Sequence, residues 1–243
     1  RSLAEQRRQL DFLQLQNRSF GEAFEMEEEL AARIESFELA YRMQLAAPEA
    51  LDVARESEAT RKLYGLDNPK CRDFGVQCLM GRRLLERGVR FVQIYSGGDT
   101  NPTSWDAHNK LVQNHTMFSG ETDYPIAGLL TDLDKRGLLD DTLVIWGGEF
   151  GRTPVSEGKD GRDHNPFAFT TWMAGGGIRG GTIYGETDEF GWRSVRDRVS
   201  VHDLHATILH ILGIDHEKLT YRFNGRDFRL TDVYGNVLNE ILS

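Results

Sequence analysis

Three short polar clusters carry the side chains of this sequence that could do chemistry. In chain order they are Asp106 and His108 in "WDAH", Glu149 and Arg152 in "GGEFGRT", and Asp163, His164 and Asn165 in "GRDHNP". Carboxylates and imidazoles are common protein ligands of zinc and related divalent metals. A guanidinium can hold a phosphate or sulfate group through two parallel hydrogen bonds. The residue types therefore indicate a metal site beside an anion-binding group.

Each cluster taken alone has a structural alternative. An aspartate two residues before a histidine is also typical of an Asx turn followed by a surface histidine. Glu149 could pair with Arg152 as a loop ion pair, and a single histidine such as His164 is often structural. The metal-site hypothesis therefore depends on whether the three clusters meet in space, which the elements between them decide.

The chain before residue 89 has the pattern of helices. Residues 2–17 and 21–45 repeat apolar side chains every three or four positions, with glutamate, glutamine, arginine and alanine between them. Pro48 is placed to open a further helix, and Gly88 is placed to end the last one. We assign residues 1–88 to a helical segment that packs on a sheet, and we expect no chemistry from it.

From Val89 onward the pattern alternates between strands and helices. Apolar, β-rich runs occupy 89–95, 141–147 and 167–176, and helical spacing recurs over 122–139 and 199–214. This alternation predicts that residues 89–243 form an α/β portion whose sheet is substantially parallel. Ligands of such sheets bind at the carboxyl ends of the strands, and all three polar clusters lie at predicted strand ends.

Convergence at that edge would bring together two carboxylates and two imidazoles. The expected metal ligands are Asp106, His108, Glu149 and His164, and the expected substrate contacts are Arg152 and Asn165. Two imidazoles favour zinc or another transition metal over calcium. Zinc is the leading candidate, and calcium, manganese and magnesium stay open.

The other potential metal ligands have a structural interpretation. Cys71 and Cys78 stand seven residues apart, on one face of a helix, and fit neither a zinc pattern nor a disulfide framework. His202 and His205 lie in an amphipathic helical pattern with Asp203 near its start. We expect buried thiols in the first case and a packed helix in the second.

Five ordered motifs resemble the domain-of-unknown-function 1501 family. They are "GVRFVQIYSGG…WDAH", "DDTLVIWGGEFGRTP", "GRDHNPF", "AGGGIRGGTIYGETDEFG" and "VHDLHATILHILGID", within about residues 70–230. The family is a bacterial group related to sulfatases within the alkaline phosphatase superfamily. The resemblance implies an alkaline-phosphatase-like, largely parallel sheet flanked by helices, with a metal pair at its carboxyl edge. In the superfamily this pair activates a serine, threonine or modified cysteine toward a phosphate or sulfate ester.

By this resemblance, Asp106 and His108 share one metal with His164, and Glu149 is a ligand of a second metal. Phe150 departs from the superfamily pattern, because many relatives carry the second residue of an Asp-His pair there. Phenylalanine cannot ligate a metal, so the second site is expected to be weakened or altered.

Two further departures from the family pattern concern the part of the sheet that precedes the matched motifs and the loop before Asp106. Relatives carry an aspartate ligand and the nucleophile before everything matched here, so the resemblance implies the C-terminal portion of a longer protein. The family's compact "GGWD" is opened to "GGDTNPTSWD". Thr103, Ser104 and Thr153 are available hydroxyls, but no base-and-orienter arrangement marks one of them as the nucleophile.

Composition limits the partners of the chain. A formal net charge of -9 disfavours nucleic acids and anionic membranes. No apolar run is long enough for a transmembrane helix, and the first residues lack the pattern of a secretory signal. A periplasmic or extracellular location is implied by the family alone.

Two functional hypotheses follow. The first is a metal-dependent hydrolase of phosphate or sulfate esters that acts on a small anionic ester or a sulfated glycan. The second is a non-catalytic metal- or glycan-binding module that keeps the fold. The ligand set favours the hydrolase, whereas Phe150 and the missing nucleophile favour the module.

Overall fold

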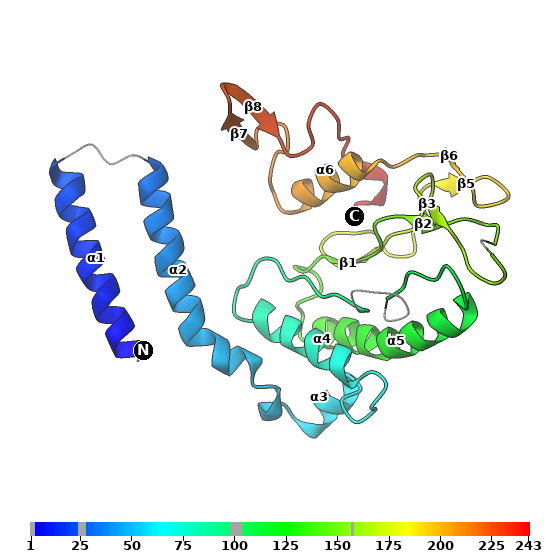
Figure 1. Ribbon diagram of the computed structural model, residues 1–243, viewed down its shortest axis with the longest axis horizontal. Helices are drawn as coiled ribbons and strands as arrows, with labels where there is room; N and C mark the ends of the chain where they lie inside the picture. Colours follow the sequence, from blue (N-terminus) through cyan, green and yellow to red (C-terminus); the bar gives the residue numbers. More distant parts are fainter. Residues whose placement is uncertain (1–2, 24–27, 98–103, 157) are drawn as a thin grey trace. The chain divides into compact units, whose positions relative to one another are not determined.

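The computed structural model describes residues 3–23, 28–97, 104–156 and 158–243 (Figure 1). Contacts within the chain divide it into two compact units. The first unit comprises residues up to 57 together with 83–92, and the second comprises 58–82 and 93–243. This division differs from a single boundary near residue 88, because helix α4 (Arg72–Leu85) begins in the second unit and ends in the first.

The first unit is built on two long helices, α1 (Leu3–Ala23) and α2 (Glu28–Leu51), which Figure 1 shows side by side in blue. Arg7 of α1 donates two hydrogen bonds to the carboxylate of Glu38 on α2, at 3.0 and 3.1 Å. Its guanidinium also lies over the ring of Tyr41. A helix does continue through Pro48, so the prediction of a separate helix opening at that residue is wrong.

The C-terminal end of α2 is capped by a side chain of α4. Arg83 donates from Nε to the carbonyl of Ala50 and from Nη2 to the carbonyl of Glu49, both at 2.7 Å. Its Nη1 pairs with Glu56, which follows the short 3₁₀ helix η1 (Val53–Arg55). The last carbonyls of a helix lack intrahelical donors, so Arg83 satisfies two of them while it neutralises a nearly buried carboxylate.

The second unit begins with α3 (Glu58–Leu63), whose last residue lies against α5 (Leu111–Lys135). Gly128 of α5 makes this approach possible, because a Cβ atom at that position would overlap the carbonyl oxygen of Leu63. The expected helix over 122–139 is therefore present but begins eleven residues earlier, at Leu111.

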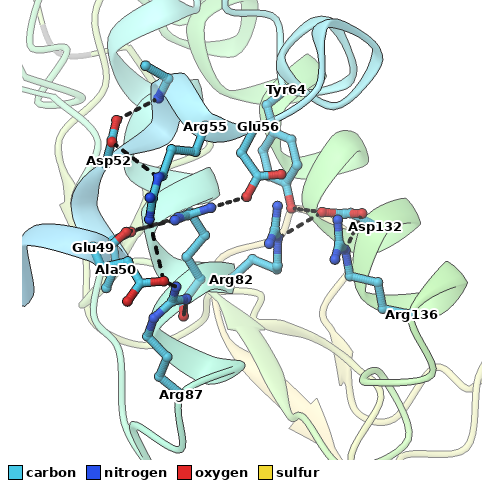
Figure 2. A network of polar contacts seen from close by, with 12 residues as sticks. Glu49, Ala50, Asp52, Arg55, Glu56, Tyr64, Arg82, Arg87, Asp132 and Arg136 are labelled. Carbon is cyan, nitrogen blue, oxygen red and sulfur yellow. Dashed lines mark hydrogen bonds and ion pairs between the residues drawn. The ribbon is translucent and has the colours of Figure 1, made fainter. Parts of the chain in front are cut away.

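A buried carboxylate joins these helices (Figure 2). Asp132 of α5 accepts a hydrogen bond from Tyr64 Oη at 2.9 Å and pairs with Arg82 Nε at 2.9 Å and Arg136 Nε at 2.7 Å. Burial raises the pKa of Tyr64, and the charge of Asp132 raises it further, so the phenol stays protonated as a donor. Paired and bonded in this way, Asp132 can be buried without remaining an isolated charge.

The strands of the described residues form four two-stranded antiparallel sheets. The pairs are β1 (Val144–Trp146) with β4 (Trp172–Ala174), β2 (Gly151–Arg152) with β3 (His164–Asn165), β5 (Glu186–Thr187) with β6 (Ser194–Arg196), and β7 (Thr220–Phe223) with β8 (Arg226–Arg229). The mixed helix and strand content agrees with the predicted class.

A substantially parallel sheet is not present in the described part of the chain. Strands β1 and β4 match two of the predicted strands, but the segment between them contains the β2–β3 pair and no helix. A parallel neighbour needs a long crossover, usually a helix, so a chain that returns without one pairs antiparallel. Residues 89–96 pair with none of the described strands, so the strand predicted over 89–95 is not present.

Helix α6 (Val201–Ile211) begins with a reciprocal cap, in which Ser200 and Asp203 bond each other's backbone N–H groups. Asp203 Oδ1 also accepts from the backbone and side-chain nitrogens of Asn236, at 2.7 and 3.1 Å. The cap therefore ties the start of α6 to the segment that leads to the last 3₁₀ helix, η2 (Asn239–Ile241). The predicted packed helix is confirmed.

Cys71 and Cys78 are buried free thiols, as predicted. Burial raises the pKa of Cys78 to about 12. None of the helices in the described ranges combines the length and the apolar character that a membrane crossing requires.

Candidate metal centre

Three of the predicted ligands meet in the second unit. Asp106 Oδ1 lies 3.0 Å from His108 Nε2 and 2.9 Å from His164 Nε2, and the two imidazole nitrogens are 3.1 Å apart. Within the described ranges these three residues form a group that could hold a metal ion. A tetrahedral zinc ion with ligand distances near 2.0 Å separates its donors by about 3.3 Å. The donor spacing therefore fits a single small ion.

Helix α5 positions the segment that carries Asp106. The Trp105 ring stacks on Phe118 with centroids 5.2 Å apart, and Asn114 Nδ2 donates to the carbonyl of Ser104 at 2.9 Å. Phe118 and Asn114 are four residues apart and share a face of the helix. One turn of α5 thus holds the two residues that precede the ligand.

The loop of His108 is docked against the segment that leads to His164. Arg162 N donates to the carbonyl of Ala107 at 3.0 Å, and Ala107 is fully buried. A Cβ atom on Gly161 would overlap the carbonyl oxygen of His108, so no larger residue fits at this contact. Ligands 56 residues apart in sequence are brought together here by close backbone approach.

The short β2–β3 ladder fixes His164 itself. Arg152 stands opposite His164 and Gly151 opposite Asn165 in the antiparallel register. The Phe150 ring lies against the imidazole of His164 with centroids 4.2 Å apart. Phe150 therefore supports a ligand through ring contact, although it cannot ligate a metal.

Arg152 is bonded directly to the ligand carboxylate. Its Nη2 donates to Asp106 Oδ1 at 2.7 Å, and its Nη1 reaches the carbonyl of Arg162 at 3.4 Å. Burial by itself would raise the pKa of Asp106, but the hydrogen bonds from His164 and Arg152 outweigh it, so this pKa is held below its usual range. Asp106 is therefore ionised at neutral pH and ready to act as a ligand.

A family model described as "Protein of unknown function (DUF1501)" matches residues 1–242. The chain belongs to this family. The match covers the helical segment before residue 70 as well as the five motifs of the α/β portion. Searches of curated proteins and of solved structures found no match.

Glu149 does not join the other predicted ligands of this family member. It is exposed, and it lies outside the group formed by Asp106, His108 and His164. Asn165, in contrast, is buried, and its side chain bonds the backbone of three neighbouring residues. The structure thus brings together three predicted ligands and Arg152.

The available hydroxyls of the DUF1501 chain take part in local bonds. Ser104 Oγ accepts from Asp106 N at 3.3 Å, and Thr153 Oγ1 accepts from Asp163 N and donates to the carbonyl of Val155. Thr103 and the other inserted residues up to it, 99–103, lie outside the described ranges.

His115 is a site neighbour that sequence reasoning missed. Its ring meets the edge of Trp105 with centroids 5.5 Å apart. Burial lowers the pKa of His115, and the positive charge of Arg152 lowers it further. The available signal was its position three residues before Phe118 on the same helical face, but only the fold places that face beside the ligands.

Proposed function

We propose that this DUF1501 chain carries the metal centre of a phosphate- or sulfate-ester hydrolase, in the manner of sulfatases within the alkaline phosphatase superfamily. The observation that carries the proposal is the trio of Asp106, His108 and His164, whose donor atoms lie 2.9–3.1 Å from one another, close to the donor separation around a single zinc ion. The motif resemblance supports the relationship to the superfamily.

Zinc is the ion that this donor set favours. Two imidazoles and one carboxylate are a common ligand set of catalytic zinc, which keeps a fourth position open for water or substrate. Calcium prefers six to eight oxygen ligands, so two nitrogen donors disfavour it. When bound, such an ion acts as a Lewis acid on an ester oxygen and lowers the pKa of a bound nucleophile.

Arg152 supports the choice of an anionic substrate. Its guanidinium has five N–H donors in a planar fork, and two hydrogen bonds are formed in the structure. The remaining donors could bind oxygens of a phosphate or sulfate group beside the metal. Glu149 stays a proposed ligand of a second metal.

The exposure of the centre suits a small ester or a sulfated glycan. The side chains of Asp106, His108 and His164 are 40, 32 and 42% exposed. The end of a glycan chain could therefore reach these three side chains without a change in the described loops. The net charge of -9 disfavours a nucleic-acid phosphate as the substrate.

A specific observation favours the alternative of a non-catalytic metal- or glycan-binding module. The hydroxyls of Ser104 and Thr153 lie close to the ligands in sequence, and each takes part in a local backbone hydrogen bond. Neither is oriented by a base in the way a nucleophile requires.

Turnover of nitrophenyl phosphate and nitrophenyl sulfate, with and without added zinc, separates the two functions. Zinc-dependent turnover that a chelator and Arg152→Ala both abolish would support the hydrolase. Stoichiometric zinc without turnover would support the module. A chain that binds no zinc, manganese or calcium would contradict both the hydrolase and a metal-binding module.

A further inference from the structure

The turn between β5 and β6 is organised by a single carboxylate. Asp188 Oδ1 accepts from the backbone N–H groups of Phe190 and Trp192 at 3.2 and 2.8 Å, and Oδ2 accepts from that of Arg193 at 3.0 Å. The backbone of Asp188 and Arg193 is also bonded, at 2.9 Å. These bonds, that from Trp192 first, hold the pKa of Asp188 below its usual range, so the carboxylate is charged at neutral pH.

This turn is fastened to the strand that carries His164. Asn165 Nδ2 donates to the carbonyls of Trp192 at 3.0 Å and Gly191 at 3.5 Å, while Oδ1 accepts from Phe167 N at 3.1 Å. Asn165 is 1% exposed. The Asp188 carboxylate binds the N–H groups of Trp192 and Arg193, which belong to the same peptide groups as the two carbonyls. It therefore orients the carbonyls that Asn165 contacts.

A second set of contacts joins the same two segments. Ser194 N donates to the carbonyl of Phe167 at 3.1 Å. The guanidinium of Arg193 lies 4.4 Å from the centre of the Phe167 ring. The 188–193 turn and the residue after it are therefore bound to this segment at two points, Asn165 and Phe167.

Strand β3 has little rigidity of its own, because it consists of His164 and Asn165 only. Its backbone pairs with β2, and the side chain of Asn165 is hydrogen-bonded to the 188–193 turn. Residues that orient a metal-binding histidine without touching the metal commonly change metal affinity by about 10–100-fold.

We propose that Asp188 is a positioning residue of the metal centre, which shapes the 188–193 turn, anchors Asn165 and thereby sets the orientation of the His164 imidazole. This role rests on the proposed metal site. It assigns Asp188 no contact with metal or substrate.

The test is cobalt(II) binding to the full chain, read by affinity and by the visible absorption spectrum, which reports ligand geometry. Asp188→Ala is expected to weaken cobalt binding by about 10–100-fold and to alter the spectrum. Asp188→Asn keeps an acceptor for Phe190 and Trp192 but loses the one for Arg193. It should therefore restore part of the affinity and most of the spectrum.

Asp215→Ala is the matched control, since Asp215 is another loop aspartate that accepts a backbone hydrogen bond, from Glu217 N at 3.0 Å. It should leave the cobalt spectrum unchanged. If the wild-type chain binds cobalt and Asp188→Ala binds it with unchanged affinity and spectrum, the positioning role is wrong while the metal site stands.

Absence of cobalt binding in the wild-type chain would instead contradict the metal site itself. If Asp188→Ala does not fold, Asp188→Asn decides the question. A weakened cobalt affinity in the folded Asn variant supports the positioning role, and an affinity equal to that of the wild type overturns it.

Discussion

One oxygen atom, Asp106 Oδ1, is the common point of the candidate centre. Arg152, His108 and His164 each place a nitrogen within 3.0 Å of it. The two histidines and the carboxylate have the spacing of ligands, whereas Arg152 can only donate. The trio is therefore suited to hold a metal cation, whereas Arg152 is suited to hold an anion.

The residue-scale prediction concerns Glu149. Because Glu149 lies outside the trio, Glu149→Ala should retain one bound zinc per chain, whereas His164→Ala should lose it. Elemental mass spectrometry of the purified variants gives the stoichiometry directly. His205→Ala on α6 is the histidine control and should retain the metal. Loss of zinc in Glu149→Ala would show that the trio alone does not hold it.

Pairs of short segments, and not one continuous sheet, assemble the site. The loop of His108 docks on residues 160–162, and β3 pairs with β2. Each pairing contributes few hydrogen bonds, so steric fit at the points of closest approach decides whether the ligands meet.

Gly161→Ala should separate the ligands. The added methyl group would overlap the His108 carbonyl, so the loop must move away from the segment before His164. We expect zinc binding to fall by at least tenfold while the helical circular dichroism signal is kept. Gly180→Ala, where the added atom meets no neighbour, is the control and should bind as the wild type does.

Asp203 gives α6 a pH-dependent cap. Burial by itself would raise its pKa, but bonds from Ser200 and Asn236 outweigh this effect and lower the pKa below its unfolded value. A lowered folded-state pKa means that the stabilisation is fully present above the ordinary carboxyl pKa and is lost as pH falls below it, through the lowered pKa of the folded state.

Asp203→Asn should therefore cost about 1–2 kcal/mol of unfolding free energy at pH 7, the usual range for a lost helix cap. The difference in unfolding free energy between the variant and the wild type should narrow as pH falls below about 4. Thermal unfolding of both proteins across pH measures this difference. A difference that is independent of pH would mean that the charge of Asp203 does not stabilise the cap.

The chain as a whole consists of two compact units, and two units need not unfold together. Arg83 stabilises the first unit, since it caps α2 and pairs with Glu56, whose side chain is 10% exposed. Asp132 and its partners hold helices of the second unit (Figure 2).

Arg83→Met should destabilise the first unit by about 3–5 kcal/mol, because it leaves the Glu56 carboxylate nearly buried without this partner. Hydrogen exchange is expected to show lost protection in α2 while α5 keeps its protection. Arg87→Met removes a more exposed pair with Glu49 at 3.5 Å and should have a small effect. Equal loss of protection in α5 would show that the two units unfold as one.

Local pattern predicted α1, α2, α4 and α6, the C-terminal part of α5, the strands β1 and β4, the buried thiols and the residue types of the centre. These features depend on neighbours within a few positions, which set helical periodicity, capping and apolar runs. The prediction that Asp106, His108 and His164 share a site came from motif resemblance, because spacing alone left surface and structural alternatives open for each cluster.

Only the tertiary structure decided the direction of the sheets, the bond from Arg152 to Asp106 and the overlap that excludes a side chain at Gly161. It also decided the exposure of Glu149 and the hydrogen bonds between Asn165 and the 188–193 turn. Each of these depends on backbone segments tens of residues apart that come within hydrogen-bond distance. That approach is set by the packing of the whole unit, which no short stretch of sequence specifies.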